Sequence, residues 1–135
     1  QTQIWKFQGY VHYSLEDFGS AIRAYRKVIN GAGTPPELRL DTRYTLAQLF
    51  TVEERYAEAA KELEIYMQES TIVGADAKVL LAQIYYQLER KADSLRMLEE
   101  AITDVESKGI LPKEGWWGLQ RVLYYEKNNY PKCNG

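Results

Sequence analysis

Hydrophobic positions along the chain recur every three or four residues, with polar residues between them. Trp5, Val11 and Leu15 follow this spacing, and Phe18 and Ile22 continue it in the next stretch. Such a spacing places side chains on one face of an α-helix. No stretch keeps the period of two that is typical of a half-buried strand. The pattern therefore predicts an all-α protein.

Glycine and proline divide this pattern into helices. Gly31 and Gly33 predict the end of the second helix, because glycine tolerates a positive φ. Thr34 is then expected to cap the third helix, with proline in its first turn. Pro131 is expected to begin a last, truncated helix. The other predicted helices run over about residues 3–15, 17–29, 36–52, 56–69, 75–88, 91–107 and 112–127.

Small residues recur at the same place in each predicted helix pair, at Gly9 and Ala21, Ala47 and Ala59, and Ala82 and Ser94. Successive copies lie 35 to 39 residues apart, a period that marks a solenoid of stacked helix pairs. Two helices approach closely only where side chains are small, so these positions should set each crossing. Larger residues are expected to fill the space around the crossings: His12, Phe50, Tyr85, Tyr124, Tyr25, Leu63 and Leu98.

The fourth copy is the least regular. Trp117 aligns with the large residue that opens each copy, so it is expected to pack on the preceding helix and to leave Trp116 exposed. Arg121 stands where a small residue is expected, which leaves the register of this copy open. Cys133 takes the small-residue place of the truncated last helix. Because the chain begins without Met and stops inside a predicted helix, it is interpreted as a fragment of a longer protein.

Trp5, Gly9, Phe18, Ala21 and their counterparts in the later copies resemble the tetratricopeptide repeat, whose pattern is W-x2-L-G-x2-Y followed by A-x3-F and P. The resemblance implies a right-handed superhelical solenoid of antiparallel helix pairs with about three and a half repeats. One domain, 1–135, would hold repeats at about 2–35, 36–73, 74–111 and a truncated 112–135. Arg43 and Lys78 depart from the pattern, because they replace its opening large residue.

In that family a groove is lined by fixed positions on the first helix of each pair. The resemblance assigns this partner-binding groove to Lys6, Tyr10, Tyr13, Tyr44, Gln48, Gln83, Tyr86 and Tyr125, and places on the same face Gln3, Asp41, Thr51, Asp76, Val79, Val122 and Glu126. A glutamine amide both donates and accepts hydrogen bonds, and tyrosine offers contact area at a low entropy cost. A largely uncharged peptide or a partner helix is therefore expected in the groove. The alternative is that these tyrosines cover the core or contact another repeat.

The family's members that bind chaperone tails use a carboxylate clamp of Lys, Asn and Arg on this surface. Only Lys6 fits that clamp here. Tyr10, Thr45, Asp76 and Leu80 stand at its other positions, which excludes this class of partner.

Composition and the missing motifs argue against other functions. A net charge of −2 does not favour nucleic acid, and no apolar run reaches the 18 to 20 residues or so of a membrane span. His12 is the only histidine and stands at a core position, so neither a metal nor a catalytic site is predicted. The carboxylates Glu53, Glu54, Glu58, Glu62 and Glu64 are interpreted as a solvated helix face. The chain is therefore expected to be non-enzymatic and to use no cofactor.

Two further hypotheses concern the partner. Residues 117–133 look like bacterial tetratricopeptide proteins associated with TonB energy-transduction systems, which implies an adaptor in the Gram-negative cell envelope. A periplasmic location would follow, with the cytoplasm as the alternative. The second hypothesis is a structural module that associates, for example into a homodimer, through its solenoid ends near Trp117, Tyr124 and Cys133.

Overall fold

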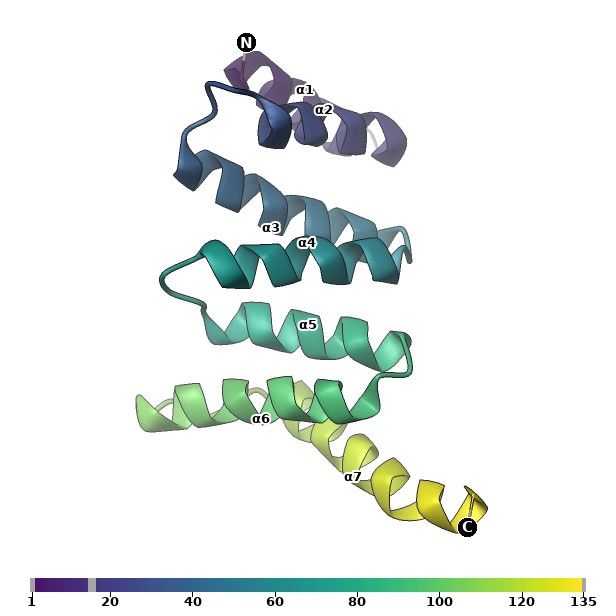
Figure 1. The fold of residues 1–135 in the computed structure, drawn as a ribbon. Helices are drawn as coiled ribbons and strands as arrows, with labels where there is room; N and C mark the ends of the chain where they lie inside the picture. Colours follow the sequence, from purple (N-terminus) through teal and green to yellow (C-terminus); the bar gives the residue numbers. More distant parts are fainter. Residues whose placement is uncertain (1, 15–16, 135) are drawn as a thin grey trace. The chain divides into compact units, whose positions relative to one another are not determined.

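The computed structural model describes the backbone of residues 2–14 and 17–134, and the side chains of residues 2–10 and 17–128. The described backbone is helical between short turns and contains no strand, which confirms the all-α prediction (Figure 1). Its helices are α1 (Thr2–Ser14), α2 (Phe18–Asn30), α3 (Pro36–Val52), α4 (Tyr56–Glu69), α5 (Ala75–Gln87), α6 (Lys91–Ser107) and α7 (Glu114–Asn134).

The helices fall into two compact units, Gln1–Thr71 and Ile72–Gly135. In the first unit α1 packs on α2, α3 packs on α4, and α2 also contacts α3. In the second unit α6 lies between α5 and α7 and contacts both. Within the first unit α3 and α4, and within the second unit α5 and α6, are joined by a short turn and run antiparallel (Figure 1). The prediction of one domain with a truncated fourth repeat stays a prediction.

Small side chains set the helix crossings, as predicted. Gly9 is buried on α1, and a Cβ atom built on it would lie 2.7 Å from Cε1 of Tyr25 on α2. That separation is too short for two carbon atoms, so only glycine allows the Tyr25 ring to lie on this helix. Ala47 and Ala59 are fully buried where α3 crosses α4. The repeated small residues are therefore a packing requirement.

Ser94 takes the place of an alanine in the second unit and is fully buried on α6. Its hydroxyl donates a hydrogen bond of 2.6 Å to the carbonyl oxygen of Ala82 on α5. A buried hydroxyl without a partner would cost about 1–3 kcal/mol. The bond across the crossing therefore makes serine compatible with this position.

The turn between α3 and α4 holds a cluster of charged and aromatic groups. The guanidinium carbons of Arg55 and Arg26 lie 4.7 and 5.4 Å from the ring centroid of Phe50. Arg55 also donates two hydrogen bonds of 2.7 Å to the carboxylate of Glu58. Glu54 adopts a φ of 58°, and the next amide, that of Arg55, donates to the carbonyl of Phe50. This backbone bond closes the turn and offsets the strain of the left-handed residue.

The same turn recurs between α5 and α6. Glu89 has a φ of 62°, and the amide of Arg90 donates to the carbonyl of Tyr85. The Arg90 guanidinium carbon lies 4.2 Å from the Tyr85 ring centroid, and its nitrogens reach Asp93. The same cluster therefore occurs once in each compact unit. It consists of an aromatic residue near the end of one helix, an arginine just before the next helix, and an acidic residue three positions after that arginine.

Ion pairs take the place of the opening aromatic residue in the second and third repeats. Arg43 of α3 lies 2.8 Å from Oε1 of Glu62 on α4, and both side chains are largely buried. Lys78 of α5 lies 2.6 Å from Oδ2 of Asp104 on α6, and this carboxylate raises the pKa of the Lys78 ammonium. The expectation of a solvated acidic face is therefore wrong at Glu62. The tetratricopeptide pattern has an aromatic residue where Arg43 stands. Glu62 is the buried carboxylate that balances the charge of Arg43.

The predicted cap of α3 is also wrong. The Thr34 hydroxyl donates to the carbonyl oxygen of Val28, at 2.6 Å, and Pro35 occupies the N-cap position without a side-chain hydrogen bond. Arg39 reaches back from α3 to the carbonyls of Ile29 and Gly31. Thr34 and Arg39 therefore satisfy carbonyls at the end of α2.

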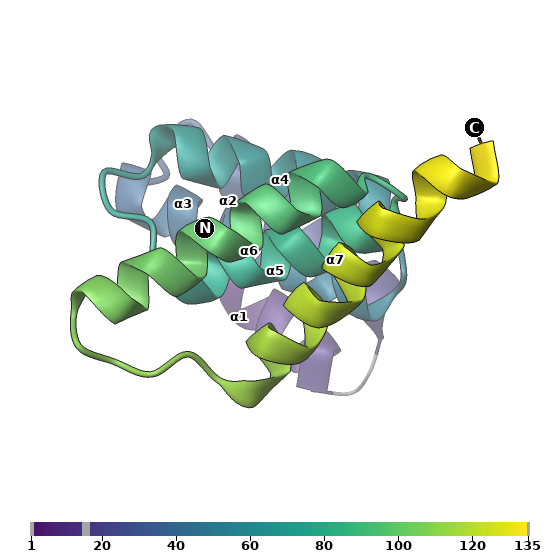
Figure 2. The same cartoon turned by 90° about the horizontal axis from the view of Figure 1, so that it is seen from below.

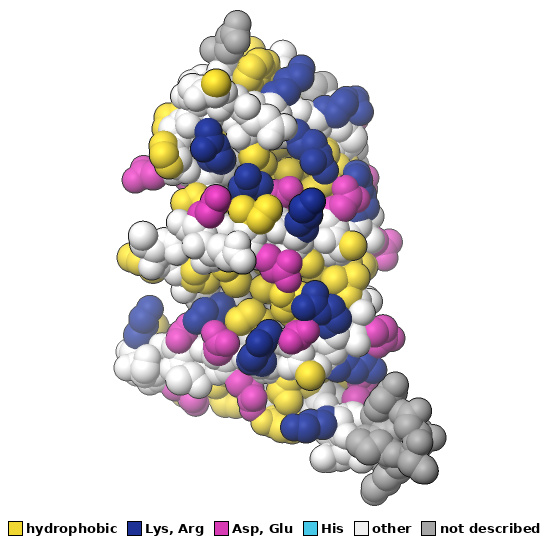
Figure 3. Space-filling view, viewed as in Figure 1, with side chains coloured by type: hydrophobic (Ala, Val, Ile, Leu, Met, Phe, Trp, Pro, Cys, Tyr) yellow, Lys and Arg dark blue, Asp and Glu magenta, His cyan; other side chains and the backbone are white. Residues whose placement is uncertain are grey.

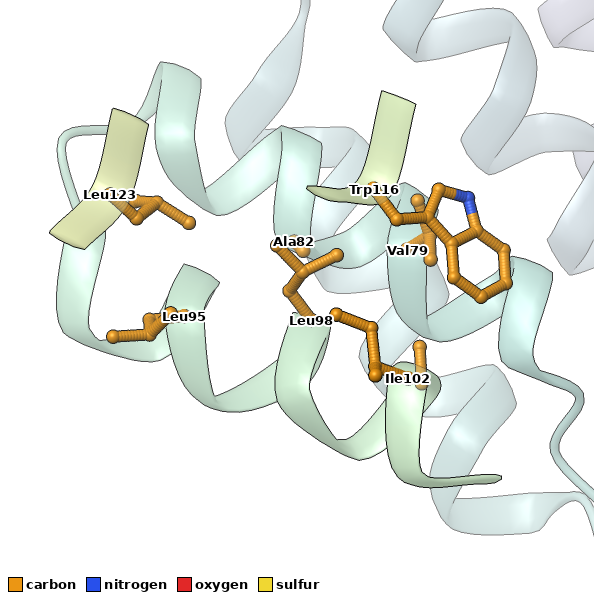
Figure 4. Packing of buried hydrophobic residues seen from close by; sticks show 8 residues of the cluster. Val79, Ala82, Leu95, Leu98, Ile102, Trp116 and Leu123 are labelled. Atoms are coloured by element: carbon orange, nitrogen blue, oxygen red, sulfur yellow. The ribbon is translucent and has the colours of Figure 1, made fainter. Parts of the chain in front are cut away.

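The fourth copy is shifted by one residue from the predicted register. Trp116 is only 8% exposed and Leu123 is buried, whereas Trp117 is half-buried and Tyr124 is 40% exposed. Figure 4 shows Trp116 against Val79, and the same cluster includes residues of α6. The expectation that Trp116 is exposed and that Tyr124 fills the crossing is wrong, because α7 turns a different face toward α6.

The predicted break before Pro131 is absent from the described backbone. α7 continues past Lys127 as one helix to Asn134. Asn128 and Asn129 precede the proline, and neither is the glycine that commonly ends a helix. Cys133 consequently lies in α7 and not in a following helix. Its side chain and that of His12 lie outside the described residues.

Candidate functional site

The predicted groove residues of the first unit lie on α1 and α3. Lys6 and Tyr10 are exposed on α1, and the side chain of Tyr13 lies outside the described residues. Gln48 is exposed on α3 and lines a hollow of about 240 Å³ together with Tyr25 and Val52. A polar amide therefore stands at the rim of a small hollow with mainly apolar walls.

Tyr44 is placed differently from Gln48. Its ring meets that of Tyr66 on α4 edge to face, with centroids 5.2 Å apart, and its side chain is half-buried. This arrangement is favourable for aromatic pairs. Tyr44 therefore contributes to packing between α3 and α4, in agreement with the alternative that some of these tyrosines cover the core.

In the second unit Gln83 is exposed on α5, and Tyr125 is 70% exposed on α7. Tyr86 is half-buried, and its hydroxyl donates a hydrogen bond of 2.9 Å to Oε2 of Glu126. Val79 is buried beside Trp116, so its predicted place on an open face is wrong. The cause is α7, which covers this part of α5.

A charged network holds α7 to the other helices of its unit. The Lys91 ammonium of α6 lies 2.6 Å from Oε1 of Glu126 and 5.7 Å from the Tyr86 ring centroid. Lys91, and after it the Tyr86 hydroxyl, lower the pKa of the Glu126 carboxyl. In return the Glu126 carboxylate raises the pKa of Lys91 and of Tyr86. Three helices therefore meet at one ionised carboxylate.

Acid should weaken the attachment of α7. Because the folded-state pKa of Glu126 is lowered, its stabilisation is complete above the unfolded pKa of about 4.3 and is lost as pH falls through the folded value. We expect the wild-type chain to lose about 0.2–1 kcal/mol more stability between neutral and acidic pH than Glu126→Gln does. Urea unfolding at a series of pH values measures this difference.

Glu106→Gln is the matched control for that series, because Glu106 is an exposed carboxylate of α6. This variant should keep the acid sensitivity of the wild type. A Glu126→Gln variant that is as acid-sensitive as the Glu106→Gln variant would contradict the role of Glu126.

A larger hollow, which the sequence does not predict, lies in the second unit. It measures about 1200 Å³ and is lined by residues of α6 and α7, by the turn before α6, and by Lys78. Neither helix alone indicates it, because it depends on the angle at which α7 leaves α6 (Figure 2).

Neither a metal site nor a membrane span is found among the residues that the structure describes. No group of three or more His, Cys, Asp or Glu side chains is arranged to hold a metal ion in this part of the chain. None of the described helices combines the length and the apolar character that a membrane span needs.

Antiparallel helix pairs with small residues at their crossings define an all-α solenoid of the tetratricopeptide type. No protein-family model matches the chain, and no curated protein matches it. Solved structures with a similar fold include two of MamA, a tetratricopeptide-repeat protein.

The two MamA structures resemble the chain to a similar degree. One has a TM-score of 0.67 at 24% identity and covers 76% of this chain, which spans only 53% of that protein. The other has a TM-score of 0.72 at 20% identity and covers 92% of this chain and 67% of its own. At these identities the likeness shows a shared fold alone.

Proposed function

We propose that the chain is a non-enzymatic protein-interaction module that binds a largely uncharged peptide or a partner helix on the first helices of its pairs. The observation that carries the proposal is the exposed Gln48 amide at the rim of a small hollow. An amide in this place can pair with the backbone of a bound segment while its apolar side chains enter the hollow. The fold is compatible with many partners, so these residues, and not the fold, carry the proposal.

The surroundings of this face favour a ligand with few charges. Among its predicted residues in the first unit, Lys6 and Asp41 carry opposite charges, and Tyr10 is exposed and aromatic. In the second unit the exposed candidates are Gln83 and Tyr125. A ligand rich in carboxylates would find too few cations here to offset the loss of its hydration.

The narrower role of an envelope adaptor near a TonB system rests on the resemblance of residues 117–133 to such proteins. It supplies a testable partner class, because segments of that machinery can be synthesised as peptides. It adds no residue to the binding face described above.

The experiment begins with peptides selected from a random displayed library against the chain. We expect the selected sequences to be poor in Asp and Glu, and Gln48→Ala and Gln83→Ala each to weaken binding of the best peptide about tenfold, equivalent to about 1.4 kcal/mol. Fluorescence polarisation measures the affinity.

Gln68→Ala is the matched control, because Gln68 is an exposed glutamine on α4, away from the first helices of the pairs. This variant should bind like the wild type. Selection of acidic tails, or equal binding by all three variants, would overturn the proposed binding face.

A further inference from the structure

The outward face of α2 carries positive charge only. Arg23, Arg26 and Lys27 are exposed on it, and the sequence of α2 contains no acidic residue. By contrast α4, the second helix of the next pair, contains Lys61 and four glutamates. Figure 3 shows dark blue side chains gathered over α2, with fewer magenta ones among them. In a chain whose net charge is −2, this concentration of cations is a local feature of one surface.

The stability of α2 does not account for these charges. Arg23 lies three residues before Arg26 and four before Lys27, and like charges that lie so close on a helix repel each other. The helix dipole favours Lys27 in the last turn, but it gives Arg23 no such support. The Arg23 guanidinium donates to a neutral group, the Ser20 hydroxyl, at 2.8 Å, and Lys27 has no carboxylate partner among the described residues. A carboxylate supplied by another molecule would therefore relieve the repulsion on this face.

Two arginines between α2 and α4 are held in place and remain accessible. Arg26 of α2 and Arg55, just before α4, both lie against the Phe50 ring. Their side chains are 45% and 43% exposed, and both donate to the carboxylate of Glu58. The bond from Arg26 is long, at 3.4 Å, so its guanidinium can still bind a second carboxylate. A planar group that a ring already fixes loses less freedom on binding.

Lys61 extends the positive charge onto α4. It holds the repeat position of Arg23, two residues after the small residue at the crossing. It is exposed and pairs with no carboxylate of the described part of the chain. The Arg26–Glu58 contact joins α2 to α4 within one unit. The cations of the two helices therefore form one basic surface, made up of Arg23, Arg26, Lys27, Arg55 and Lys61.

A protein segment suits the basic surface better than a lipid bilayer does. Apart from its cations, the exposed residues of α2 are Gly19 and Asn30, so the helix offers no large hydrophobic side chain to enter a membrane. Glu53 and Glu54 are exposed beside Arg55 and would repel a broad anionic surface. The cations are spread along α2 and across to α4. They therefore match several carboxylates in a row and not a single phosphate group.

We propose that the basic surface binds an acidic helix of a partner protein. Glutamates three or four residues apart share one face of such a helix, as the cations do on α2. Complementary charges speed association, and salt screens the attraction between them. The basic surface lies on the second helices of the pairs in the first unit, whereas the peptide-binding face lies on the first helices. The two faces therefore bind ligands of different character, one with few charges and one rich in carboxylates.

Fluorescence polarisation on the full chain tests the proposal with a synthetic Ala-rich helix that carries Glu at every fourth position. A peptide with Gln in place of each Glu should bind at least about tenfold more weakly, and added salt should weaken binding of the Glu peptide. Arg23→Glu should weaken that binding about tenfold. It should not lower the melting temperature, because it removes a repulsion and creates a favourable pair with Lys27 four residues later.

Lys108→Glu is the matched control, because Lys108 is exposed in the second unit and its substitution changes the net charge by the same amount. This variant should bind the Glu peptide like the wild type. Equal weakening by Lys108→Glu and Arg23→Glu, or a Glu peptide that binds no better than the Gln peptide, would overturn the proposal. Binding to phosphatidylglycerol vesicles without binding to the Glu peptide would assign the surface to lipid and overturn it as well. Gln48→Ala should keep its affinity for the Glu peptide, which separates this result from that for the peptide-binding face.

Discussion

Replacement of Phe50 by Ala should destabilise the first unit by about 3–5 kcal/mol. Phe50 is fully buried where α3 meets α4, and its loss leaves a cavity between these helices. The guanidinium groups of Arg26 and Arg55 also lose the ring on which they lie. A domain of ordinary stability has about 5–15 kcal/mol in total, so the variant should be partly unfolded at physiological temperature.

Urea unfolding followed by far-UV circular dichroism measures this loss. Phe7→Ala is the control, because it removes the same side chain from an exposed site on α1. In dilute solution it should change stability by less than about 0.5 kcal/mol. Equal effects of the two substitutions would show that Phe50 is not the centre of the α3–α4 crossing.

The helices themselves were predictable because their signals are local. The bounds of α3, α4 and α6 agree with the sequence expectations, since proline, glycine and the repeated small residues mark them directly. Gly9 illustrates the strength of this signal, because the Tyr25 ring occupies the place of a side chain there. The corresponding position holds a small residue in each of the first three copies, at Gly9, Ala47 and Ala82.

Errors arose where a side chain's role depends on a distant partner. Thr34 stands where a helix N-cap is expected, but its hydroxyl donates a hydrogen bond to a carbonyl oxygen at the end of the preceding helix. From the sequence, Glu62 resembles the surface carboxylates near it, but in the structure it is buried and forms an ion pair with Arg43. Neither partner can be identified from spacing along one helix. Such pairings appear only when two helices are placed together.

The candidate binding face was also predictable only where the signal is local. Its positions on α1, α3 and α5 followed from the repeat, but the sequence did not indicate that Tyr86 is bound by Glu126 or that Val79 is buried. Both outcomes depend on α7. The hollow on α6 was unpredictable for the same reason, because its depth is set by the rotation of α7 and by where Leu123 lies.

Replacement of Trp116 by Ala should release α7 from the second unit. Trp116 and Leu123 are the described residues of α7 that are buried in the core. Trp116 lies beside Val79, and Leu123 lies beside Leu95 (Figure 4). Loss of a buried tryptophan costs about 3–5 kcal/mol. The Lys91–Glu126 ion pair, which is partly exposed, contributes too little to hold the helix alone. We expect hydrogen exchange to become fast in α7 while α5 and α6 remain protected.

Trp117→Ala distinguishes the observed register from the one that the repeat pattern predicts. Trp117 is half-buried at the border of the same cluster, so its loss should cost less and leave α7 protected from exchange. Tyr125→Ala removes an exposed aromatic of the same helix and should have no measurable effect on exchange. If Trp117→Ala released α7 and Trp116→Ala did not, the register inferred from the sequence would be right, and the face that α7 turns toward α6 would have to be reassigned.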